Sequence, residues 1–154
     1  MTDSNTPSRT LTEDEEMSFS SGIAAFEAKH FSQAMQLLSP LSEKDAQSQH
    51  MLAIMHQNGL GCVENPMQAV KMMKASAEQG YPIAQHGLGF MYMQGECLEK
   101  NSAKAIKWFE KAAEQGMQGS LTTLAMMYEQ GEGVEKDIDK AKELYKAAGF
   151  DDLG

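Results

Sequence analysis

Apolar and small residues recur along this chain at a fixed interval of 36 positions, three times over. The repeated residues are of several kinds and keep one register: Leu52, Leu88 and Leu124; Met55, Met91 and Met127; Gly59, Gly95 and Gly131; Ala69, Ala105 and Ala141. A period of this length is typical of supersecondary units that stack on one another and bury a shared core. We therefore expect an array of repeats, a class of protein that usually presents a surface to a partner.

Each repeat is predicted to be a helix, a short loop and a second helix, with no strands. The regular blocks run over 45–80, 81–116 and 117–152. The first helices begin near Asp45, Pro82 and Gln118 and end before the periodic glycines, which accept the left-handed conformation that closes a helix. The second helices begin after one shared repeat position, whose side chains can cap a free backbone N–H: Asn65, Asn101 and Asp137.

The segment before the regular blocks is less repetitive. Residues 1–11 are polar, and we expect a disordered tail there. Residues 12–44 are interpreted as a degenerate opening helical hairpin, which begins with an acidic helical turn at 13–16. Its second helix carries apolar residues at helical spacing, namely Phe31, Ala34, Leu37, Leu38 and Leu41. Residues 12–152 are thus predicted to form a single all-α domain.

Small and large residues alternate in ways that suit close helix packing. Small residues recur on both helices of each repeat, where a large side chain would force the pair apart: Ala53, Gly89 and Ala125, then Ala69, Ala105 and Ala141. Large residues are expected to fill the remaining space, including Leu88, Tyr92, Trp108, Phe109, Leu124, Tyr128, Leu144 and Tyr145.

Composition narrows the class of partner. The chain of 154 residues has a net charge of -9, and its one arginine, Arg9, lies in the tail. Nucleic-acid and anionic-membrane surfaces need clustered lysine and arginine, so neither partner is expected. No secretory signal or membrane span is visible, and Cys62 and Cys97 are interpreted as reduced thiols, which favours a cytoplasmic location.

The residues of the second and third blocks resemble a known family. The run 88–92, then Gly95, Trp108-Phe109 and the stretch 111–116 is similar to the Sel-one-like repeat, a relative of the tetratricopeptide repeats, and 124–148 matches at equivalent positions. The first block is looser, with His56 in place of the tyrosine. The resemblance covers about 45–150 and implies a right-handed α-solenoid of stacked helix-turn-helix repeats, with its first helices on the concave side. It also implies an adaptor or scaffold role in protein assemblies.

The first helices are almost without charge. The windows 46–58, 82–94 and 118–130 together contain a single charged residue, Glu129, and the lysines sit on the second helices instead. Burial explains part of this depletion, but a surface helix normally keeps charge on its exposed face. We therefore predict that a neutral concave strip binds a peptide or helix of another protein. By tetratricopeptide geometry the strip contains Gln47, His50, Ile54, Gln57, Ile83, His86, Phe90, Met93, Thr122, Met126 and Glu129. If its histidines face apolar partner groups, binding should weaken near pH 6.

Other functions have weaker support in the residues. His50 and His86 share a repeat position but should stand roughly 10 Å apart, too far for one metal ion, and no metal or other cofactor is expected. Ser48 and Ser120 are equivalent to Ala84, which marks a small packing position, and no nucleophile motif occurs, so no enzyme activity is expected. Some secreted, cysteine-paired members of the family are associated with β-lactamase or penicillin-binding activity. A β-lactamase-like, small-ligand-binding or metal-binding function within the same repeat family and a dedicated inhibitor or immunity-type role stay as alternatives.

The C-terminal edge is a second candidate surface. After Tyr145 the chain has no further helical signal, although terminal repeats usually carry a cap or a polar outer face. We expect weak homo-oligomerisation or partner docking there, involving Leu144 and Phe150.

Overall fold

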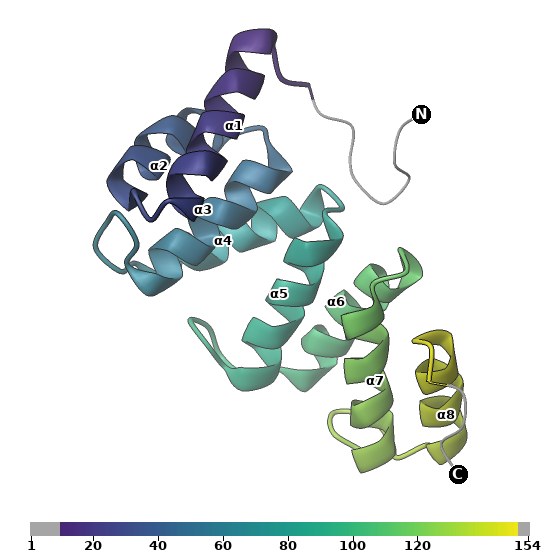
Figure 1. The fold of residues 1–154 in the computed structure, drawn as a ribbon. Helices are drawn as coiled ribbons and strands as arrows, with labels where there is room; N and C mark the ends of the chain where they lie inside the picture. Colours follow the sequence, from purple (N-terminus) through teal and green to yellow (C-terminus); the bar gives the residue numbers. More distant parts are fainter. Residues whose placement is uncertain (1–9, 151–154) are drawn as a thin grey trace. The chain divides into compact units, whose positions relative to one another are not determined.

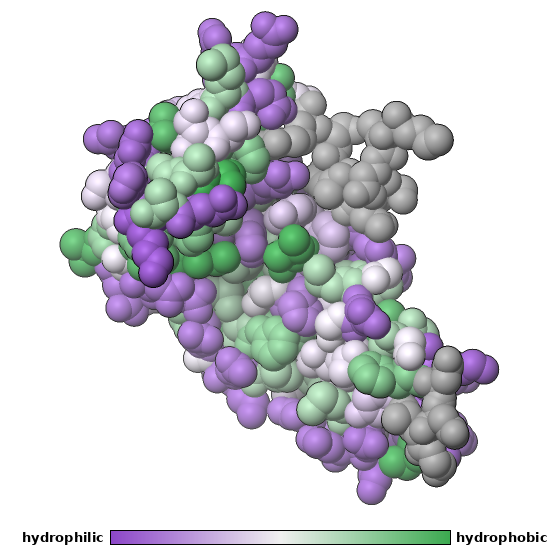
Figure 2. Space-filling model, viewed as in Figure 1, coloured by the Kyte–Doolittle hydropathy of each residue, from purple (hydrophilic) through white to green (hydrophobic). Residues whose placement is uncertain are grey.

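The computed structural model describes residues 10–150, and within them it contains eight α-helices, one short 3-10 helix and no strand (Figure 1). The all-α class predicted from the repeat is confirmed. The predicted disordered tail lies outside the described residues except for Thr10 and Leu11. Hydrophilic and hydrophobic side chains are interspersed on the face drawn in Figure 2. The chain divides into two compact units, one up to Ala84 and one from Gln85, and each is described by itself.

The first unit holds two helical hairpins. Helix α1 spans Glu13–Glu27 and packs against α2, Phe31–Leu38, which runs into the 3-10 helix η1 at Ser39–Leu41. The predicted second helix therefore tightens at its end, because Pro40 lacks the N–H that an α-helix would need at that point. Helix α3, Ala46–Asn58, then packs against α4, Pro66–Glu78.

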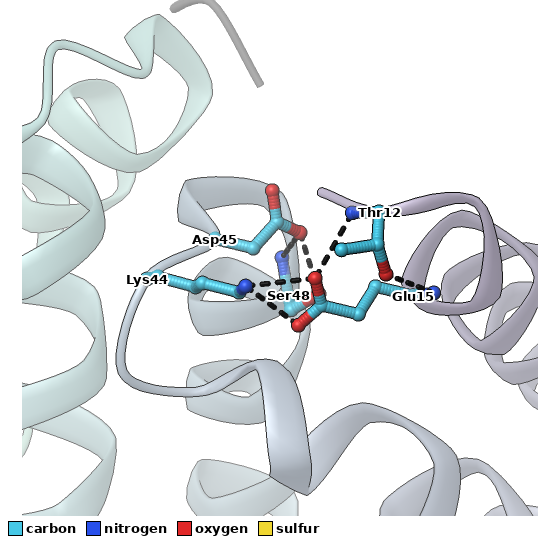
Figure 3. A network of polar contacts seen from close by, with 5 residues as sticks. All are labelled: Thr12, Glu15, Lys44, Asp45 and Ser48. Atoms are coloured by element: carbon cyan, nitrogen blue, oxygen red, sulfur yellow. Dashed lines mark hydrogen bonds and ion pairs between the residues drawn. The ribbon is translucent and has the colours of Figure 1, made fainter. Parts of the chain in front are cut away.

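A polar network joins the start of α1 to the loop before α3 (Figure 3). Thr12 and Glu15 cap α1 reciprocally, because each side chain accepts a hydrogen bond from the other's backbone N–H. The Lys44 ammonium lies 2.6 Å from Glu15 Oε2 and, with the capping bond from Thr12, lowers the pKa of that carboxyl. The buried Asp45, next to Lys44 in the chain, is the N-cap of α3. Its side chain accepts hydrogen bonds from the backbone N–H and from the hydroxyl of Ser48.

The second unit contains most of α5, Pro82–Gln94, followed by α6, Ser102–Glu114, α7, Gln118–Gln130, and α8, Ile138–Ala147. Helix α6 packs against α7, and α7 packs against α8. The predicted caps are confirmed throughout: the side chains of Asn65, Asn101 and Asp137 each accept from the backbone N–H three residues on. Gly59, Gly95 and Gly131 all have the predicted left-handed conformation.

The core follows the repeat register, with one correction. Leu52, Leu88, Leu124 and the periodic alanines are buried, as predicted. Gly89 lies directly against Phe109: a Cβ at position 89 would come 2.7 Å from its ring. However, the expectation that all the large residues fill the core is wrong, because four of them stay partly exposed: Trp108, Tyr128, Leu144 and Tyr145.

A second set of left-handed residues lies two positions after each closing glycine. These residues are Gly61, Cys97 and Gly133, with φ of 74°, 69° and 72°. The repeat therefore demands this conformation even where the residue is a cysteine, for which it is strained. The sulfur of Cys62 lies 3.6 Å from His56 Nδ1, within hydrogen-bonding reach. Neither Cys62 nor Cys97 forms a disulfide bond.

Candidate functional site

Helix α3 carries the first part of the predicted strip. Gln47, His50, Ile54 and Gln57 are all partly buried on it. The His50 ring packs edge-on against Tyr81, with ring centroids 5.7 Å apart, and this burial lowers its pKa to about 4. Tyr81 is a supporting residue that the sequence reasoning did not single out. The α3 face is therefore neutral and presents amide and aliphatic groups.

Helices α5 and α7 carry the second part. On α5, His86, Phe90 and Met93 are partly buried, and Ile83 is 43% exposed. On α7, Thr122 is partly buried and Met126 is 46% exposed. In Figure 2, the side chains over α7 and the adjoining part of α5 are mostly pale or hydrophobic in colour.

An aromatic cluster fixes the middle of this α5–α7 face. The rings of His86, Phe90 and Phe109 lie 4.9–5.4 Å apart by centroid, in edge and tilted contacts. His86 Nδ1 shares a 2.7 Å hydrogen bond with the Ser120 hydroxyl, which ties α5 to α7. Gly119 makes room for the imidazole, since a Cβ there would lie 3.3 Å from its Cε1. These contacts hold Phe90 in place while its outer edge stays exposed.

The register alone could not reveal the partners of His86. Ser120 was interpreted as a small packing residue, and it is fully buried, but it also bonds the histidine. A serine bonded to a histidine can be the beginning of a nucleophile–base pair. Here the serine has no exposed surface, so a substrate cannot reach its oxygen. The arrangement is that of a structural hydrogen bond.

Glu129, the one charged member of the strip, is held at its edge. Its carboxylate accepts a hydrogen bond of 3.2 Å from the Tyr145 hydroxyl of α8. The negative charge of Glu129 and burial of the phenol together raise the pKa of Tyr145, burial being the larger cause. The tyrosine therefore stays a donor at physiological pH and directs the carboxylate towards α8 rather than along α7.

Metal-binding residues do not gather in the described part of the chain. No group of three or more His, Cys, Asp or Glu side chains there is arranged to hold an ion. The contact of Cys62 with His56 is a pair without a third ligand, and burial raises the pKa of the thiol, which disfavours the thiolate that binds metals. Among residues 10–150 no helix is long and apolar enough to cross a membrane.

Stability should depend on pH through His50. Folding lowers the pKa of His50. Between about pH 6.5 and 4 its imidazole is therefore protonated in the unfolded chain but stays mostly neutral in the folded chain. The free energy of unfolding is therefore expected to be highest above this window and to fall by about 2 kcal/mol as the pH drops through it. Urea unfolding at a series of pH values measures this loss.

The matched controls for this measurement are two substitutions to glutamine. His50→Gln removes this titrating group and should make the profile less steep, whereas His30→Gln makes the same substitution at an exposed histidine and serves as the control. Equal slopes for the parent and His50→Gln would show that other groups set the acid sensitivity.

Comparison with known proteins identifies the class to which these hairpins belong. The model of the Sel1 repeat matches three times, at residues 46–81, 82–117 and 121–149. Since these matches cover more than half of the chain, the protein belongs to the Sel1 repeat family, and its fold is the α-solenoid of that family. No curated protein matches the sequence closely.

Solved structures give the same fold. A Sel1 repeat protein from Oxalobacter formigenes is 32% identical with a TM-score of 0.79, over 85% of this chain and 53% of that one. The protective antigen c5321 of uropathogenic Escherichia coli, which has the same repeat fold, is 31% identical with a TM-score of 0.82, over 87% and 30%. The cysteine-rich protein B of Helicobacter pylori is 17% identical, with a TM-score of 0.56 over 90% and 89%, and supports the fold alone. The present chain therefore spans about half the length of the first relative and under a third of the second.

Proposed function

We propose that this protein is a non-catalytic adaptor that binds a peptide or helix of another protein on the exposed faces of its first helices. Sel1 repeats are commonly protein-interaction modules, and the proposal names the surface. The observation that carries it is the near absence of charge on α3, α5 and α7, together with exposed apolar groups such as Met126. Covering a neutral face costs less desolvation than covering lysines and carboxylates.

The α5–α7 face supplies the anchors. Phe90 has a fixed ring edge, and Met126 offers a flexible apolar side chain that adapts to the shape of a partner. His86 and Gln57 can add hydrogen bonds. Burial lowers the pKa of His86, as it lowers that of His50, so each ring takes up a proton at a lower pH than an unperturbed histidine does. We therefore expect partner binding to weaken on acidification at a lower pH than the value near 6 that an unperturbed histidine predicts.

Paired methionine substitutions test the surface once a partner has been isolated by pull-down. Met126→Glu places a charge on the first-helix face and should weaken binding about tenfold or more, and Phe90→Ala should cost about 1 kcal/mol or more. Met67→Glu makes the same change on α4, where the methionine is 84% exposed, and should leave the affinity unchanged. Isothermal titration calorimetry measures each affinity. If Met67→Glu weakens binding and Met126→Glu does not, the second helices are the binding surface.

We also propose weak self-association through the end of α8. Phe150 is 47% exposed and packs edge-on against Tyr145, and a cavity of about 330 Å³ lies beside them, lined also by Ile138 and Ala141. A second molecule could cover these apolar groups, and sedimentation velocity over a range of concentrations would detect it. We also propose a cytoplasmic location, which the lack of a disulfide bond at Cys62 and Cys97 supports.

A further inference from the structure

A second apolar site, lined by none of the strip residues, is a groove formed by α6, α7 and α8. Its volume is about 290 Å³. Its larger apolar lining residues are Leu121, Leu124 and Tyr128 of α7 and Leu144 of α8. It is also lined by Glu110, Ala113 and Glu114 of α6 and Lys140 of α8. We call this the α6–α8 groove.

One residue that lines the groove is smaller than its equivalent in the second repeat. The position of Leu144 is Trp108 in the second repeat and Met72 in the first. Tyr92 is buried, whereas its equivalent Tyr128 is partly exposed in the groove. The groove is large enough for an aromatic ring, since an apolar cavity of about 150 Å³ is enough to hold benzene.

A second difference between the repeats makes the groove more apolar. The first two repeats each have a glutamine pair that joins the start of the first helix to the end of the second, Gln49 with Gln79 and Gln85 with Gln115. In the third repeat the first position of the pair is Leu121. A hydrogen-bonding group has thus been replaced by an aliphatic one at the groove, and an aromatic side chain could pack there without displacing a polar contact.

The charges at the rim indicate what lies next to that aromatic group. Glu110 and Glu114 stand one turn apart on α6 and are both exposed. Among the described residues neither carboxylate has an ion-pair partner. Lys140 of α8 is the single positive group of the groove lining. The α6 side of the groove is therefore negative, in a chain of net charge -9.

We propose that the α6–α8 groove binds an aromatic side chain of a partner protein, presented by a segment that carries lysine or arginine next to it. The ring lies in the groove against Leu121, Tyr128 and Leu144. The basic group pairs with Glu110 and Glu114. This site lies outside the first-helix strip, and its test is independent of the test of the adaptor proposal.

A suitable probe is a fluorescently labelled peptide with blocked ends and one tryptophan between lysines. The full chain is titrated into this peptide, and the fluorescence anisotropy of the peptide measures binding. Replacing its tryptophan with alanine should weaken binding about tenfold. Leu144→Trp restores the residue of the second repeat and fills the groove, and should likewise weaken binding about tenfold. Glu110→Gln with Glu114→Gln should weaken it about threefold or more and reduce its dependence on salt.

The matched control is the double variant Glu135→Gln and Glu143→Gln, which removes the same charge from exposed residues outside the groove lining. This double variant should bind the tryptophan peptide with the affinity of the parent protein. Phe90→Ala, on the first-helix strip, should do the same. Equal weakening by the control pair would mean unspecific charge attraction and would overturn the proposal, as would full affinity of Leu144→Trp. If circular dichroism shows that Leu144→Trp does not fold, Leu121→Gln makes the same test with the residue of the first two repeats.

Discussion

Phe109→Ala is expected to lower the free energy of unfolding by about 3–5 kcal/mol, the largest effect of any single substitution considered for this chain. Phe109 is fully buried and is the bulkiest of the fully buried side chains. Its ring lies against the backbone of α5 at Gly89 and against the rings of His86 and Phe90. The helices around Phe109 cannot fill the space left by its ring without moving as rigid units. The loss of stability therefore combines the lost hydrophobic burial of the ring with the cost of the cavity that remains.

Urea denaturation followed by circular dichroism measures this effect, and the neighbouring residue supplies its control. Trp108 is larger but partly exposed, so Trp108→Ala should cost less, about 1–2 kcal/mol. If Trp108→Ala costs as much as Phe109→Ala, the assignment of the buried face of α6 is wrong. Phe109→Ala should also loosen Phe90, and therefore weaken partner binding on the first-helix strip.

Gly61→Ala should destabilise the first unit by about 2–4 kcal/mol, for two reasons that add. The residue has φ of 74°, where an alanine is strained. In addition, an alanine Cβ would lie 2.4 Å from the carbonyl oxygen of Phe31, which belongs to the backbone at the start of α2 and cannot rotate away. Thermal or urea unfolding of the variant measures the sum of the strain and the clash.

Gly80→Ala separates the two contributions. Gly80 also has a positive φ, of 94°, but nothing lies within 4 Å of the position where its Cβ would be. It should therefore show the backbone strain alone, about 1–2 kcal/mol. By the same reasoning Cys97→Gly, at the repeat position of Gly61, should stabilise the chain by about 1 kcal/mol. Equal losses for Gly61→Ala and Gly80→Ala would show that the loop moves away from α2 at little cost.

The helix boundaries could be predicted because their signals are local. Asp45, Asn65 and Asp137 cap the helices that follow them, and the closing glycines end the first helices where expected. A cap acts within three residues of its own position, so the sequence around it is sufficient. Ile83 and Met126 are exposed on α5 and α7, which the repeat register alone could predict, whereas most other strip residues are partly buried.

Contacts between residues far apart in sequence were not predictable in the same way. The bond between His86 and Ser120 joins residues 34 positions apart, and it depends on the separation and rotation of α5 and α7. The link between Tyr145 and Glu129, and the partial exposure of Trp108, depend similarly on how the helices of the second unit meet. Small residues such as Gly119 make room for such contacts, but their role is visible only when the opposing side chain is known.

The sequence by itself determined the repeat, the helices and their ends, and the neutrality of the first helices. These features arise from local hydrogen bonding, backbone conformation and residue type, all of which recur every 36 residues. The tertiary structure alone decided that Leu144 and Leu121 border an open groove and that Phe90 is held by an aromatic cluster. The volume between helices depends on the side chains of three elements together, and no single repeat position specifies it.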